Sequence, residues 1–214
     1  MQIEAVVFDV GETLVDETQV WGSWADAIGV PRLTFFAALG ALVARGERDH
    51  GRVFDLVRPG LTHADAIAAR GGSEAGFTER DLYPDARRAL LRLRQAGFQI
   101  GIAANQPPQA ALALERCGLA YDWLLVSAIE RVAKPDPAFF RLVAQRAGLP
   151  AERIAYVGDR LDNDVRPAAA AGVCAVHLRR GPWGVVQASG DGANPAALRV
   201  DNLDELVATL TGDH

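Results

Sequence analysis

Residues 3–14 read IEAVVFDVGETL, and the first expected strand of the chain lies within them. The run from Ala5 to Phe8 is short, apolar and rich in valine, which is typical of a strand buried on both faces of a parallel sheet. It ends at the carboxylate of Asp9, at the carboxyl end of the expected strand. Ligands of open α/β sheets bind at that edge. A carboxylate there can be a nucleophile or a metal ligand, whereas the simpler alternative is an Asp that caps a loop.

Strand-like and helix-like segments alternate from Tyr83 onward. Apolar runs at 98–104, 123–126, 153–157 and 173–178 are separated by helical stretches, several of which end in glycine. Such alternation is typical of βαβ units. The sequence therefore predicts an α/β fold with a Rossmann-like parallel sheet.

Residues 16–82 interrupt this alternation. They are mostly helical in pattern, are broken at glycines and prolines, and contain no strand-like run. We therefore expect a core domain formed by residues 1–15 and 83–214, with a small helical domain, residues 16–82, inserted after the first strand.

Composition excludes several functional classes. The chain has 214 residues and a net charge of −5 without long single-sign runs, which argues against nucleic acid or an anionic membrane as its main partner. No apolar stretch reaches the ~18 residues of a membrane span, and the N-terminus lacks the pattern of a secretion signal. The isolated Cys117 and Cys174 fit a reducing compartment, so we expect a cytoplasmic protein. The oligomeric state stays open.

Polar residues of one chemical kind follow the expected strands. Asp9 follows the first strand, Asn105 the second, and Asp159 and Asp164 come at and after the end of a later one, while Lys134 lies between. Carboxylates from two strand ends with one lysine predict a Mg²⁺ site that faces a phosphate. The alternatives are an acidic helix start for the two later aspartates, a surface lysine, and a turn cap for Asn105.

With these motifs in this order, the sequence resembles the haloacid dehalogenase-like hydrolase superfamily over nearly the whole chain. Residues 8–14 (FDVGETL) are similar to its first motif, and residues 102–105 (IAAN) fall where its second motif lies. Residues 133–137 (AKPDP) resemble its lysine motif, and residues 158–164 (GDRLDND) resemble its acidic motif. The insertion after the first motif resembles the helical cap type of this superfamily.

The resemblance implies a role for each of these residues. Asp9 is the expected nucleophile, Lys134 a catalytic and substrate-binding residue, and Asn105 a substrate-binding residue. The expected cofactor is Mg²⁺, held by Asp9, the backbone carbonyl of Gly11, Asp159 and Asp164. The expected substrate is a small phosphorylated metabolite, cleaved through an aspartyl-phosphate.

Two positions depart from the pattern of the phosphatases in this superfamily. Gly11 stands where they carry the Asp that acts as general acid/base, and Ala104 stands where a Ser or Thr binds phosphate. Both losses concern catalysis rather than the metal site, because a general acid or base contributes ~10²–10⁴-fold. The neighbouring Glu12 is a candidate replacement, although its side chain leaves the turn in another direction.

Two other functions stay open. A 2-haloacid dehalogenase also lacks the missing Asp, but it needs no metal and uses Ser before the Asn. A non-catalytic member that binds a phosphorylated ligand or a protein is the second alternative, because a fold does not guarantee activity.

Overall fold

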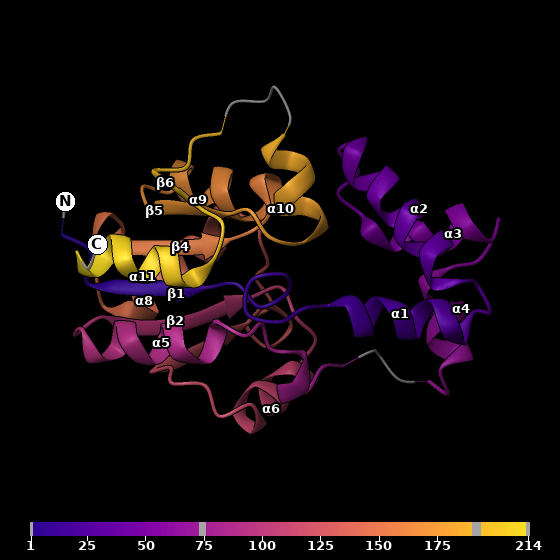
Figure 1. Cartoon of the computed structure of the whole chain (residues 1–214), viewed down its shortest axis with the longest axis horizontal. Helices are drawn as coiled ribbons and strands as arrows, with labels where there is room; N and C mark the ends of the chain where they lie inside the picture. Colours follow the sequence, from indigo (N-terminus) through magenta and orange to yellow (C-terminus); the bar gives the residue numbers. More distant parts are fainter. Residues whose placement is uncertain (1, 73–75, 190–193, 213–214) are drawn as a thin grey trace. The chain divides into compact units, whose positions relative to one another are not determined.

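The structure is a computed structural model, and it describes residues 2–72, 76–189 and 194–212. The chain divides into two compact units, Met1–Asp16 with Thr78–His214 (the sheet unit) and Glu17–Phe77 (the helical unit). Residues 78–82 belong with the sheet unit because the Asp16 backbone N–H donates to the Asp81 carbonyl at 2.7 Å and Val15 bridges to Leu82. Figure 1 labels the elements of both units.

The sheet unit contains a six-stranded parallel sheet in the order β3-β2-β1-β4-β5-β6. The strands are β1 (Ala5–Phe8), β2 (Gln99–Ala104), β3 (Trp123–Val126), β4 (Ile154–Gly158), β5 (Cys174–Leu178) and β6 (Leu198–Val200). The predicted α/β class with a Rossmann-like parallel sheet is thereby confirmed. The edge strand β6 was not predicted, because three residues with an exposed arginine at their centre carry little periodicity.

Strand β1 lies at the middle of the sheet, and its four residues are fully buried. Phe8 pairs in register with Ile102 of β2 and with Val157 of β4. All strands run the same way, so their carboxyl ends form one edge. Asp9 therefore leaves the sheet beside the ends of β2 and β4, where the sequence carries its other polar motifs.

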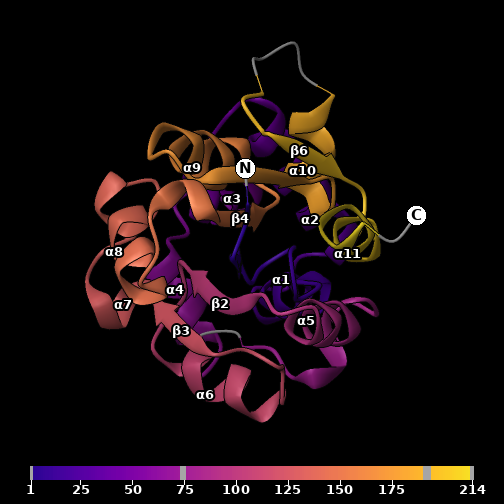
Figure 2. The ribbon, with the colours of Figure 1, turned by 90° about the vertical axis from the view of Figure 1, so that its left-hand side faces the viewer.

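Helices cover both faces of the sheet, as a parallel sheet requires. Figure 2 shows α8 (Pro137–Ala147) and α9 (Arg166–Ala170) on one face and α5 (Ala86–Gln95) and α11 (Leu203–Thr211) on the other. The remaining helices of this unit are α6 (Gln109–Arg116), α7 (Ser127–Glu130) and α10 (Gly181–Ala188).

One predicted helix differs from the structure in a way that matters for the site. The sequence favours a helix from Asp164 onward, but α9 begins only at Arg166 and is preceded by a wide π-type turn, Leu161–Val165. In this turn the Arg160 carbonyl accepts the backbone N–H groups of both Asp164 and Val165, at 2.9 and 3.1 Å. Such wide turns are rare in proteins, and those that occur often lie at functional sites.

The helical unit consists of α1 (Thr18–Ala27), α2 (Arg32–Ala44), α3 (Val53–Val57) and α4 (His63–Ala69). Its core is aromatic: the ring of Phe54 lies 5.6 Å from that of Trp24 and 5.8 Å from that of Phe35. Helix α4 begins with a capping box between Thr62 and Asp65.

In the described part of the chain, no single helix has the length and apolarity needed to cross a membrane. Helices α1 and α2 meet those two criteria only as a pair, and the pair is bent by 115°.

Candidate active site

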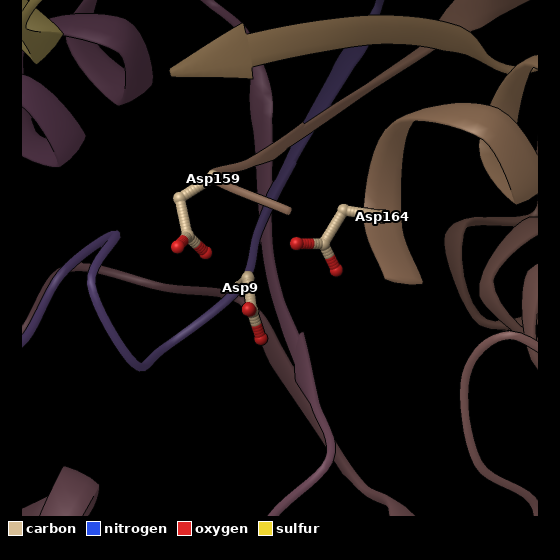
Figure 3. A group of neighbouring side chains, drawn as sticks. All are labelled: Asp9, Asp159 and Asp164. Carbon is tan, nitrogen blue, oxygen red and sulfur yellow. The ribbon is translucent and has the colours of Figure 1, made fainter. Parts of the chain in front are cut away.

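Three buried carboxylates gather at the carboxyl edge of the sheet. Asp9, Asp159 and Asp164 each offer an oxygen that lies within 4.8 Å of those of the other two. Figure 3 shows the three carboxyl groups close together, with Asp9 following β1 and Asp159 following β4. All three side chains are almost completely withdrawn from solvent. The chain thus concentrates acidic oxygens where its central strands end.

Backbone geometry fixes each of these residues. The Asp9 N–H continues the sheet ladder by donating to the Val157 carbonyl at 2.9 Å. The Arg160 N–H donates to Asp164 Oδ2 at 3.0 Å, which turns that carboxylate toward the end of β4. A Cβ at Gly158 would lie 2.5 Å from the Asp164 carboxyl carbon, so only glycine leaves room for this arrangement.

Lys134 supplies a buried positive charge to the group. Its Nζ lies 2.8 Å from Asp9 Oδ1 and 2.6 Å from Asp164 Oδ1, and its side chain is fully buried. Burial alone would lower the pKa of this ammonium, but the charges of Asp164 and Asp9 outweigh burial and raise the pKa well above its ordinary value. Lys134 is therefore a fixed cation between two of the three carboxylates.

Asn105 acts on the backbone of Lys134. Its Nδ2 donates to the Lys134 carbonyl and its Oδ1 accepts the Lys134 N–H, both at 2.8 Å. This paired contact positions the lysine segment against the end of β2. The predicted contact between Asn105 and substrate stays a prediction.

The charges of the cluster do not balance. Burial, followed by the charges of Asp164 and Asp9, raises the pKa of Asp159 well above its usual range. Burial and the charge of Asp9 also raise the pKa of Asp164, to about 6, although Lys134 opposes the shift. Asp159 Oδ2 is buried and has no hydrogen-bond partner among the residues that the structure describes. A hard divalent cation fits this set, because it would satisfy the orphaned oxygen and the excess negative charge.

The two departures from the superfamily pattern lie in the turn after Asp9 and directly before Asn105. Ala104 is buried at the end of β2 and carries no hydroxyl. Gly11 lies in the turn that follows Asp9, where the N–H groups of Leu14 and Val15 both donate to the Val10 carbonyl at 2.9 Å. The metal-binding role of the Gly11 carbonyl stays a prediction.

Two residues near the cluster were not singled out from the sequence. His177, on β5, lies with its Nε2 3.0 Å from the Asp159 carbonyl oxygen, and its Nδ1 is 2.9 Å from Asn194 Nδ2. Because the Asn194 amide donates to Nδ1, the Nε2 atom carries the proton and donates to Asp159. The Tyr156 ring lies 5.4 Å from Lys134 Nζ. His177 could have been found from the sequence, because it is a histidine near the end of an expected strand.

Comparisons with known proteins identify the family of the chain. Residues 3–172 match the sequence pattern of the haloacid dehalogenase-like hydrolases. A glyceraldehyde 3-phosphate phosphatase of Methanopyrus kandleri is 29% identical, with 96% of each chain covered. A phosphoserine phosphatase of Thermus thermophilus is 35% identical over 86% of this chain and 76% of its own length.

A solved structure shows the same fold. A HAD-hydrolase of Bacillus subtilis, described as bound to magnesium, superposes with a TM-score of 0.73 at 18% identity, covering 98% of this chain and 99% of its own. The resemblance inferred from the motifs is confirmed by the match over residues 3–172. The chain therefore belongs to the haloacid dehalogenase-like hydrolase family and is a hydrolase.

Proposed function

We propose that this hydrolase cleaves the phosphate ester of a small metabolite with Mg²⁺ as cofactor and Asp9 as nucleophile. The observation that carries the proposal is the buried group of three carboxylates around Lys134, in which Asp159 Oδ2 has no partner within the described part of the chain. The two relatives described above are named as phosphatases of small metabolites, which supports the same class of substrate.

The residues that would hold Mg²⁺ are Asp9, Asp159 and Asp164, with the backbone carbonyl of Gly11. When bound, Mg²⁺ would neutralise the charge of the phosphoryl oxygens. The donor set suits this ion, which prefers a few carboxylate oxygens and completes its shell with water and phosphate.

Asp9 forms a bond to phosphorus while the bond between phosphorus and the ester oxygen breaks. The ester oxygen leaves with the bonding electron pair and takes its proton from water, which gives the alcohol. Water then attacks the phosphorus of the aspartyl-phosphate, which releases phosphate and regenerates Asp9. Lys134 holds Asp9 Oδ1 by the 2.8 Å contact and stabilises negative charge on the phosphoryl group. Asn105 serves this step through the Lys134 backbone that it binds.

The helical unit acts as a cap that selects the leaving group, in line with its expected place after the first motif. The substrate's identity depends on that unit. The cytoplasmic location and the lack of a nucleic-acid or membrane partner stay predictions.

One specific observation supports a second candidate, a 2-haloacid dehalogenase: Gly11 stands where phosphatases of the superfamily carry an Asp. Against it stands the acidic group, because a dehalogenase of this type needs no metal. Family membership among hydrolases weighs against the binding-only alternative.

The test is turnover of p-nitrophenyl phosphate with Mg²⁺ and with EDTA, next to chloride release from 2-chloropropionate. We expect nitrophenol release that requires Mg²⁺ and disappears in Asp9→Asn. Chloride release in EDTA would instead identify a dehalogenase. A folded protein that binds phosphate esters but turns over neither substrate would instead support the non-catalytic, binding-only alternative.

A further inference from the structure

The turn after Asp9 contains a residue in a strained conformation. Glu12 has φ +52°, the left-handed region that a residue with a side chain seldom adopts. Its N–H donates to the Val15 carbonyl at 2.8 Å, so the strained backbone is part of the tight turn 10–15. Glycine would adopt this conformation without cost. A glutamate kept in such a place points to a function for its side chain.

The side chain of Glu12 lies against two other segments of the chain. The Tyr83 hydroxyl donates to Glu12 Oε2 at 2.6 Å, and the glutamate is only 5% exposed. Gly181, the first residue of α10, also lies against this side chain, because an added Cβ there would come within 2.7 Å of the Cβ and Cγ atoms of Glu12. At position 181, only glycine thus leaves space for this carboxylate.

The same two segments also hold the backbone of the turn. The Tyr83 N–H donates to the Leu14 carbonyl at 2.9 Å, and Arg180 donates from Nη1 to the Thr13 carbonyl at 2.9 Å. The Arg180 guanidinium lies 4.1 Å from the centre of the Tyr83 ring and forms a buried ion pair with Asp85. The segments that lead into α5 and α10 therefore both bind the turn.

We propose that Glu12 is a positioning residue. Its side chain is clamped by Tyr83 and Gly181, and it holds the turn 10–15 in the conformation that presents Asp9 and Gly11 for the reaction. This inference rests on the proposed phosphatase function. Because Asp9 directly precedes the turn, a shift of the turn displaces the nucleophile, and a displacement of about 1 Å can cost ~10²-fold in rate.

The kinetic test compares two replacements of Glu12. Glu12→Gly relieves the backbone strain and removes the carboxylate, so we expect a melting temperature equal to or above that of the wild type, with kcat for p-nitrophenyl phosphate lowered roughly 10- to 100-fold. Glu12→Gln keeps an oxygen that accepts the Tyr83 hydroxyl, and kcat should stay within roughly threefold of the wild type. Tyr83→Phe should lower kcat by an intermediate factor.

Two kinetic outcomes contradict the proposal. If Glu12→Gly keeps the kcat of the wild type, the strained glutamate has no role in turnover. If Glu12→Gln loses as much kcat as Glu12→Gly, the ionisable carboxyl group itself is needed, and Glu12 is the missing acid or base rather than a positioning residue.

A second measurement does not depend on turnover. Amide hydrogen exchange of the peptide that covers residues 9–15 should become faster in Glu12→Gly and in Tyr83→Phe, because the turn loses its hold. An unchanged exchange rate in both variants overturns the clamp, whatever the activity. If the wild-type protein fails to hydrolyse the phosphate ester while exchange changes as expected, the proposed function fails and the clamp stands.

A matched glycine pair isolates the contact with Glu12. Gly181 and Gly148 have φ of +65° and +66°, but an added Cβ at Gly148 meets nothing within 4 Å. Both alanine variants place a side chain at the same positive φ, so Gly181→Ala should lower the melting temperature further than Gly148→Ala because of its contact with Glu12. This additional loss should disappear in the Glu12→Gly background, as a double-mutant cycle measures. An additional loss that persists there would place the cause outside the contact with Glu12.

Discussion

The sheet unit and the helical unit bury different kinds of side chain. Among the described residues, every buried polar or charged side chain lies in the sheet unit: Asp9, Glu12, Thr13, Asp85, Ser127, Lys134, Asp159, Asp164 and His177. In the helical unit the buried side chains are apolar, and ion pairs such as Arg32–Asp26 are exposed.

The difference indicates which unit contains the residues of the proposed reaction. Burying charge is costly and seldom improves stability compared with apolar packing. A group of buried carboxylates around one lysine therefore adds little to stability, and it supports the proposed phosphatase function. The helical unit has an ordinary aromatic core, and substitutions there should act through stability instead.

The largest expected effect tests the sheet unit at its nucleophile. Asp9→Asn replaces the attacking carboxylate with a neutral, weakly nucleophilic amide, so turnover of p-nitrophenyl phosphate should fall by roughly 10⁴-fold or more. Because one charge of a crowded acidic group is removed, the fold should persist, as circular dichroism can check. Near-wild-type turnover by the folded variant would falsify the nucleophile assignment.

The next effect concerns the missing acid. Gly11→Asp should raise cleavage of alkyl phosphates by ~10²–10⁴-fold, because these poor leaving groups need a proton as they depart. Aryl phosphates need little protonation and should gain less. The measurement is kcat/KM for both substrate types with Mg²⁺, next to the melting temperature. A folded variant without gain on alkyl phosphates means that proton donation is not the defect.

In the helical unit, the corresponding test is Phe54→Ala. Phe54 is 1% exposed and touches both Trp24 and Phe35, so its loss should destabilise this unit by about 3–5 kcal/mol. Urea unfolding followed by tryptophan fluorescence measures the loss, and Leu33→Ala, at an 82% exposed position, is the control. If Phe54→Ala instead abolishes Mg²⁺ binding by the folded protein, the two units are not as independent as their cores suggest.

Much of this division could be predicted from the sequence. The run before Asp9 is short and wholly apolar, which predicts a central strand, and the order of Asp9, Lys134, Asp159 and Asp164 predicts the group at its end. The prediction of the strand is confirmed, because strand periodicity is a local signal. The four side chains also lie together in the structure, whereas their roles stay predictions.

Other features depend on contacts between distant segments. Glu12 meets Tyr83, which lies 71 positions away, and no periodicity reports such a contact. The sequence likewise shows Asn105 as a polar residue after a strand, but only the structure shows that both of its amide atoms bind the Lys134 backbone. Strand β6 was missed because an edge strand of three residues has no apolar run.

The smallest expected effect compares one buried and one exposed carboxylate, Asp159 and Asp26. In the absence of metal, Asp159 adds to the repulsion of a buried acidic group, so Asp159→Asn should raise the melting temperature by a few degrees, about 2–4 °C for each kcal/mol relieved.

Mg²⁺ at millimolar concentration should raise the melting temperature of the wild type, because binding to the native state stabilises it by mass action. The same addition should leave Asp159→Asn nearly unchanged. Asp26→Asn, at a solvent-exposed position of the helical unit, should keep the full response to Mg²⁺. A wild-type melting temperature that does not respond to Mg²⁺ would count against the metal site, and an equal response in Asp159→Asn would place the ion elsewhere.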